Sequence, residues 1–132
     1  KGQTEEETAH LRTQEARTLA LYVQKIMKAR PKMPILVYGD WNDGPADPTL
    51  GILQQGTSRE SALTRLKPAD DNGEEWTHHF RAGGEYLIYD QIYVNAPLHS
   101  RIGRKGKSGV VAAKKKGALY GSDHRAVWCE LR

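Results

Sequence analysis

The sequence predicts an α+β domain, in which one long helix precedes a series of short strands and short helices. Apolar residues recur at helical spacing over residues 5–29, and shorter runs rich in β-branched and aromatic residues follow. These runs cover residues 34–39, 76–80, 86–95 and 126–131. No internal repeat divides the 132 residues, a length typical of one domain, so we treat 1–132 as a single unit.

The long helix has clear signals at both ends. Thr4 followed by Glu7 fits a capping box, the intervening acidic residues suit the positive end of a helix dipole, and Pro31 stops the helix. The apolar stripe between these signals consists of Ala16, Leu19, Ala20, Val23, Ile26 and Met27. The sequence therefore predicts an amphipathic helix over about 5–29.

Short elements separated by turns follow this helix. The strand at 34–39 ends in dense turn signals, and residues 49–55 favour a short helix that ends at Gly56. We expect another short helix within 57–67, capped by Ser58 or Ser61, and then a loop.

The second half of the chain is richer in strands. A turn at Ala82–Glu85 should separate a strand at 76–80 from a strand at 86–95. In the latter, alternation would place Asp90 on one face with three aliphatic residues and the tyrosines on the other. We expect 101–117 to be a long loop or irregular hairpin, followed by a last strand at 126–131.

Charge and composition restrict the function classes. The net charge is +4, and the stretch from Arg101 to Lys116 holds seven basic residues and no acidic one. Such a stretch either tracks phosphates or forms a solvated loop, and both alternatives stay open. No apolar run approaches the ~20 residues of a membrane span. The single cysteine, Cys129, weakly favours a reducing, cytoplasmic compartment.

Polar residues adjoin three of the predicted strands. Asp40 and Asn42 end the first, Asp90 interrupts an apolar face, and Asp123 and His124 precede the last. Singly, Asp90 could be a satisfied structural carboxylate and Asp123 a turn or cap residue. Together they supply the oxygen ligands that Mg²⁺ or Mn²⁺ prefers, beside a histidine able to act as acid or base.

Three segments resemble ordered signatures of the endonuclease/exonuclease/phosphatase superfamily, the deoxyribonuclease-I-like proteins. These segments are Gly39-Asp40-Trp41-Asn42-Asp43, Tyr89-Asp90-Gln91-Ile92-Tyr93-Val94 and Ser122-Asp123-His124-Arg125-Ala126-Val127. The resemblance covers about residues 34–131. It implies an α/β sandwich with mixed, mainly antiparallel sheets flanked by helices.

The resemblance also implies roles for the polar residues. Asp40 would orient or deprotonate the attacking water, and Asn42 would donate hydrogen bonds to the phosphate. Asp123 would help to hold a divalent metal, Mg²⁺ or Mn²⁺. His124 would contact the scissile phosphate, as an acid–base group or electrostatically, and Asp90 would orient His124. The implied reaction is in-line attack of water on phosphorus.

Substrate-binding candidates lie elsewhere. Thr77 occupies a position that the family often places near substrate, and Arg104, Lys105 and Lys107 belong to the basic stretch. The adjacent His78 and His79 should face opposite sides of a strand, so we do not expect them to bind one metal. The scattered histidines and single cysteine match no zinc-ligand spacing.

The resemblance favours a phosphodiester hydrolase that acts on nucleic acid. The alternatives are phospholipid or inositol phosphate as substrate, or a catalytically silent scaffold with the same fold. In the family, the first half of the domain supplies a metal-binding glutamate. We therefore expect 1–132 to be the C-terminal half of such a domain, deficient on its own, and to associate with a missing N-terminal half or with itself.

Overall fold

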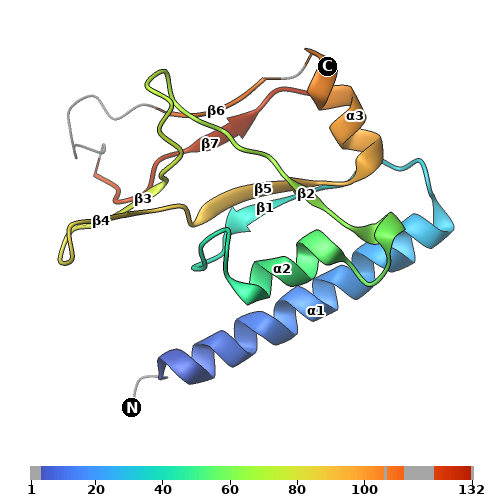
Figure 1. Cartoon of the computed structure of the whole chain (residues 1–132), viewed down its shortest axis with the longest axis horizontal. Coiled ribbons are helices and arrows are strands. Elements are labelled where there is room, and N and C mark those ends of the chain that lie inside the picture. The colour runs from blue at the N-terminus through green and yellow to red at the C-terminus, as the bar shows by residue number, and fades with distance from the viewer. Residues whose placement is uncertain (1–3, 106, 112–120, 132) are drawn as a thin grey trace.

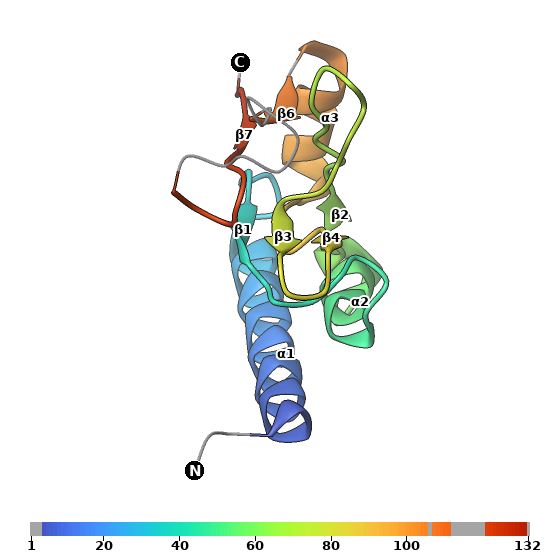
Figure 2. The ribbon, with the colours of Figure 1, turned by 90° about the vertical axis from the view of Figure 1, so that its left-hand side faces the viewer.

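The computed structural model describes residues 4–105, 107–111 and 121–131, and it combines helices with antiparallel strands (Figure 1). It therefore has the α+β character that the sequence predicts. Two helices, α1 (Glu5–Ala29) and α2 (Pro48–Gln55), lie on one side of a central sheet. A third helix, α3 (Ala96–Lys105), lies on the other side. Figure 2 shows α1 extending well past the strands, toward the N-terminal end.

Helix α1 confirms the prediction for residues 5–29. Thr4 and Glu7 form the capping box, with the Glu7 N–H donating to the Thr4 hydroxyl at 3.2 Å. The buried stripe consists of Ala16, Ala20, Val23 and Met27. It packs against Leu50 and Leu53 of α2 and against Tyr93 of the sheet, which fixes the helix beneath the strands.

The central sheet has three antiparallel strands in the order β1 (Leu36–Asp40), β5 (Asp90–Val94) and β2 (Thr64–Arg65). Leu36 pairs with Val94 at one end of β1, and Asp40 pairs with Asp90 at the other. Both faces of β5 are covered, because Tyr93 joins the core under α1 while Ile92 and Val94 join a second core with Leu98 of α3. The predicted alternation is therefore confirmed for Ile92, Tyr93 and Val94.

The strand predicted at 86–95 is broken into two. Its first part, β4 (Glu85–Leu87), pairs with β3 (His78–Phe80) in a separate hairpin, and β5 begins only at Asp90. The buried hydroxyl of Thr77 accepts the backbone N–H groups of Tyr89 and Asp90 at 3.0 and 2.9 Å. These two amides are satisfied by a side chain instead of a neighbouring strand, so the ladder is interrupted there.

The prediction of a loop over 101–117 is wrong for its first part, because α3 covers residues 96–105. The Asn95 side chain accepts the N–H of Leu98 at 3.3 Å at the start of α3, and Leu98 and Ile102 are buried one turn apart. After α3, β6 (Ser108–Val110) pairs with β7 (Val127–Cys129), which is shorter than the strand predicted at 126–131. Residues 112–120 lie outside the described residues.

The helix predicted within 57–67 is only a single 3₁₀ turn, η1 (Arg59–Ser61). Ser58 precedes it, and the Ser58 N–H donates to the Ser61 hydroxyl at 3.1 Å. The next residues leave the helical conformation to form β2, where Thr64 pairs with Val94 of β5. Pairing with the central sheet thus overrides the local helical tendency.

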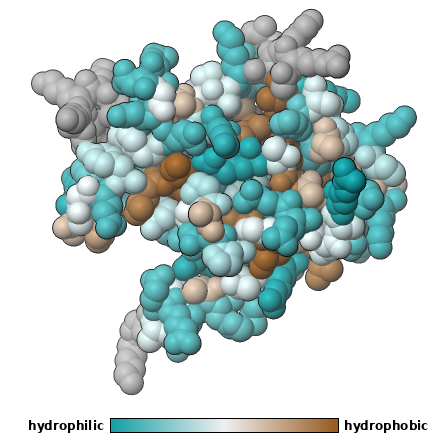
Figure 3. Space-filling model, viewed as in Figure 1, coloured by the Kyte–Doolittle hydropathy of each residue, from teal (hydrophilic) through white to brown (hydrophobic). Residues whose placement is uncertain are grey.

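The face seen in Figure 3 is mainly hydrophilic, with apolar side chains visible in scattered places between polar ones. Among the described residues, no helix combines the length and apolar character needed to cross a membrane.

Candidate active site

Two aspartates face each other at one end of the central sheet. Asp40 is the last residue of β1, Asp90 is the first residue of β5, and the two are direct partners in the antiparallel register. Residues directly opposite on antiparallel strands have neighbouring side chains, and like charges in that position are destabilising. A positive charge close to the two carboxylates would therefore stabilise the pair.

His124 lies against both aspartates. Its Nδ1 is 2.7 Å from Asp90 Oδ2, and its Nε2 is 4.0 Å from Asp40 Oδ2. The first contact is a hydrogen bond, whereas the second is too long for one. The preceding turn orients His124 through its backbone N–H, which donates to the Ser122 hydroxyl at 3.0 Å.

The environment of His124 favours its protonated form. Partial burial lowers the pKa of His124, but the hydrogen bond to Asp90 and the charges of Asp90, Asp40 and Asp123 outweigh it. The net effect is a pKa above the ordinary value of histidine. A protonated His124 is then the cation that separates the two carboxylates.

We expect the pKa of His124, measured by NMR titration in the presence of a chelator, to exceed the ordinary value of about 6.5. Asp90→Asn should lower it, because this change removes both the hydrogen-bonded carboxylate and its charge. Because folding raises this pKa, the interaction of protonated His124 with the carboxylates stabilises the folded protein below about pH 6.5. This stabilisation is lost as the pH rises through the pKa of His124 in the folded state. Asp71→Asn, at an exposed aspartate, is the matched control. An unchanged His124 pKa in Asp90→Asn would refute this electrostatic account.

These side chains line an open cleft of about 430 Å³. Its polar lining includes Asp40, Asp90 and His124, and its apolar lining includes Tyr38 and Val127. The side chain of Asp40 is 40% exposed and that of His124 is 30% exposed, so both are accessible from solvent. A small charged group can therefore reach the carboxylates and the imidazole together.

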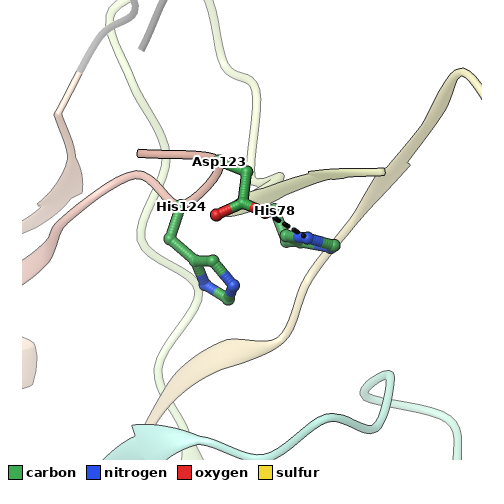
Figure 4. Close-up of side chains that lie close together, drawn as sticks. All are labelled: His78, Asp123 and His124. Atoms are coloured by element: carbon green, nitrogen blue, oxygen red, sulfur yellow. Dashed lines mark ion pairs between the residues drawn. The ribbon is translucent and has the colours of Figure 1, made fainter. Parts of the chain in front are cut away.

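Asp123 and His78 stand beside His124 (Figure 4). His78 Nε2 is 3.6 Å from Asp123 Oδ2, and the rings of His78 and His124 have centroids 4.5 Å apart. The pKa of Asp123 is lowered by its own backbone N–H and by the two histidines, although desolvation opposes this. The Asp123 side chain is 60% exposed, so its carboxylate is ionised and accessible at neutral pH.

The prediction that Thr77 contacts substrate does not agree with its position in the structure. It is fully buried, and its hydroxyl holds the backbone just before Asp90. Its carbonyl also accepts the N–H of Arg125 at 2.6 Å. Thr77 therefore ties the segment that carries Asp90 to the segment that carries His124.

Asn42 does not share the direction of Asp40. Strand β1 ends at Asp40, and Asn42 has a positive φ of 49°, with its N–H donating to Asp40 Oδ1 at 3.0 Å. The side-chain alternation of a strand consequently stops. Asn42 lines a neighbouring hollow of about 480 Å³ together with Glu5 and Arg12 of α1.

The basic candidates are described only in part. Arg104 and Lys105 end α3, but their side chains lie outside the described part of the structure. Lys107 is exposed just before β6, and its carbonyl accepts the Glu130 N–H at 2.7 Å. Lys107 is not among the residues that line the cleft described above.

Arg125, which follows His124, was not singled out from the sequence. Its buried guanidinium donates to Asp70 Oδ2 at 2.6 Å, to the Val111 carbonyl at 2.9 Å and to the Trp76 carbonyl at 3.2 Å. It also stacks over the Trp76 ring at 4.1 Å. An arginine in an alternating run next to a strand is a signal for such an interior ion pair, but its partner is distant in sequence.

His78 was considered in the sequence but not as part of this site. His78 and His79 face opposite sides, since the His78 ring stacks on Tyr89 and the His79 ring on Tyr86. The partners of His78 come from another segment of the chain. His78 forms an isolated antiparallel bridge with His124, which brings the two rings to the same side.

No protein-family model matches the chain, and neither a curated protein nor a solved structure matches it.

Proposed function

We propose that this chain contributes the catalytic carboxylates and histidine of a divalent-metal-dependent phosphodiester hydrolase, with nucleic acid as its substrate. The observation that supports the proposal best is the Asp40–Asp90 pair with His124 between the two carboxylates. The three segments that resemble the superfamily signatures supply these residues and Asp123. A deoxyribonuclease-I-like sandwich, with this chain as one of its halves, is part of the proposal.

The residues fit a hard divalent cation. Asp40 and Asp90 offer carboxylate oxygens in one group with His124, and Asp123 offers one in a second group with His78 and His124. Mg²⁺ and Mn²⁺ prefer such oxygen ligands. The like-charged pair Asp40–Asp90 is an arrangement that a cation stabilises. Asp123, the most exposed of the three, would hold the ion. The ion would neutralise charge that develops on the phosphate oxygens.

The protein residues divide the remaining work. Asp90, through its 2.7 Å contact, would hold His124 in one orientation and leave Nε2 directed away from that bond. Asp40 uses Oδ1 to accept the Asn42 N–H, so Oδ2 remains to orient or deprotonate a water molecule. Both atoms, His124 Nε2 and Asp40 Oδ2, belong to residues that line the cleft.

The proposal includes a partner surface. Strand β1 is at the edge of its sheet among the described strands, and Tyr38 on β1 is 75% exposed. Trp128 on β7 is also exposed. Edge strands and large exposed aromatic side chains are sites of association. We place here the contact with the remaining half of the domain or with a second copy, which would supply a further metal ligand.

A substrate panel tests this proposal. Wild-type protein, as the 132-residue chain and as any longer protein that contains it, is assayed on DNA, RNA, sphingomyelin and an inositol polyphosphate with Mg²⁺ or Mn²⁺. We expect the highest rate on nucleic acid and a lower rate for the 132-residue chain by itself. A higher rate on a lipid or an inositol phosphate would reassign the substrate. Absence of hydrolysis on every substrate would favour a silent scaffold.

A further inference from the structure

His78, Asp123 and His124 form a compact group on two paired segments. The His79 N–H donates to the Asp123 carbonyl at 2.9 Å, and the Arg125 N–H donates to the Thr77 carbonyl at 2.6 Å. These bonds place His78 opposite His124 in antiparallel register. Side chains of directly opposed residues lie on the same face. The backbone therefore holds both imidazoles on one side, and Asp123 adjoins them (Figure 4).

The potential ligand atoms are close enough for one ion. One nitrogen from each imidazole and one oxygen of Asp123 all lie within 4.8 Å of one another. In a tetrahedral site with bonds of about 2 Å, ligand atoms are about 3.3 Å apart. His78 Nε2 and Asp123 Oδ2, at 3.6 Å, nearly have this spacing already. A nitrogen of His124 lies within 4.8 Å of both other ligand atoms and completes the set.

The neighbours of the two imidazoles favour metal binding over a purely structural role. Asp90 accepts a hydrogen bond from His124 Nδ1, an arrangement that directs the other nitrogen of a histidine toward a metal ion. The ring of His78 stacks on Tyr89 with an interplanar angle of 15°, which restricts its rotation. Among the described residues, the buried Nδ1 of His78 has no hydrogen-bond partner, and its Nε2 faces Asp123.

We propose that His78, Asp123 and His124 form a metal site that prefers Zn²⁺, or another metal with affinity for imidazole, to Mg²⁺. Two imidazoles and one carboxylate suit zinc, whereas magnesium demands oxygen ligands. Three protein ligands leave a tetrahedral ion one open position, as in catalytic zinc sites. The site differs from the expectation drawn from sequence spacing, because its ligands come from distant segments.

This metal site adds a second ion to the proposed function. Only the part of the site in hydrolysis rests on that function. With His124 Nε2 as a ligand, His124 would act through its position on the ion, and Asp40 would be the group that takes a proton from water. Asp40 Oδ2 is 4.0 Å from His124 Nε2, so the carboxylate lies close to this proposed ligand atom. Metal binding itself requires no catalysis and is measured separately.

Metal binding to the 132-residue chain tests the inference. Titration calorimetry with Zn²⁺ and with Mg²⁺, supported by the visible absorption of bound Co²⁺, compares wild type with His78→Ala and His79→Ala. His79 is the matched control, since it neighbours His78 on β3 but its ring stacks on Tyr86. Asp123→Asn is a second variant that should fold normally, because the Asp123 side chain is mostly exposed.

We expect one Zn²⁺ per chain, bound more tightly than Mg²⁺. His78→Ala and Asp123→Asn should each weaken Zn²⁺ binding about 100-fold or more, because loss of a second-shell partner alone already costs about 10- to 100-fold. His79→Ala should change Zn²⁺ binding little. Equal weakening by His78→Ala and His79→Ala, or tighter binding of Mg²⁺, would overturn the inference. Zinc binding without hydrolysis would refute only the proposed function. Mg²⁺-supported hydrolysis that His78→Ala leaves unchanged would refute only the part of this metal site in hydrolysis.

Discussion

Arg125→Met should lower the free energy of unfolding by about 3–5 kcal/mol, because it removes one partner of a buried ion pair. The guanidinium of Arg125 is 0% exposed, and the carboxylate of Asp70 is 3% exposed. Without Arg125, Asp70 would keep a charge in the interior that no other residue in the described part of the chain pairs with. Two carbonyls, those of Trp76 and Val111, would lose a donor as well.

Urea denaturation measures this loss. Arg17→Met, at an exposed position on α1, is the matched control and should change the free energy of unfolding by less than about 0.5 kcal/mol. Adding Asp70→Leu to Arg125→Met should recover part of the loss, since the uncompensated charge is then gone. A loss below 1 kcal/mol for Arg125→Met would show that this ion pair does not hold the segments around Asp70 and Arg125 together.

Asp40→Asn should lower kcat/KM for phosphodiester hydrolysis by about 10²- to 10⁴-fold, the range in which a general base contributes. The asparagine retains the shape of the side chain and an oxygen for the Asn42 N–H, but it cannot accept a proton from water. Asp40 is 40% exposed in its side chain, and it faces a like charge. The fold should therefore tolerate the change or become slightly more stable.

Asp71→Asn controls for the loss of one negative charge, because Asp71 is exposed on a turn away from the cleft. Circular dichroism and the unfolding midpoint establish that Asp40→Asn remains folded. A decrease of less than threefold in kcat/KM, with folding intact, would remove Asp40 from the catalytic residues and leave the water-activating group to be sought elsewhere.

Local signals account for the elements that the sequence predicts well. The capping box at Thr4, the apolar stripe and Pro31 all act within a few residues of α1, and the helix forms where they place it. The same applies to α2, which begins at Pro48 and ends before Gly56. The alternation of Ile92, Tyr93 and Val94 likewise identified the two faces of β5.

Elements that depend on distant partners were predicted less well. The break before Asp90 depends on the hydroxyl of Thr77, which lies in another segment. Helix α3 was missed because its basic residues suggested a solvated loop, although Leu98 and Ile102 have helical spacing and pack against the sheet.

The candidate site was likewise predicted only in part, because some of its contacts depend on distant segments. The motifs singled out Asp40, Asp90 and His124, which the structure brings together at one end of the sheet. They could not indicate His78, whose relation to Asp123 and His124 arises from pairing between β3 and the segment before β7. Strand alternation would place Asn42 on the same side as Asp40, but the strand ends at Asp40 and Asn42 has a positive φ just beyond it.

The most direct test of metal-dependent hydrolysis at Asp40 and His124 uses one simple phosphodiester. The hydrolysis rate of bis-p-nitrophenyl phosphate is measured with Mn²⁺ and with a chelator, for the longest protein that contains this chain and for its Asp40→Asn/His124→Ala variant. The proposal predicts hydrolysis that requires the metal and is lost in the folded double variant. Equal rates for the two proteins, or a rate unaffected by the chelator, would contradict it.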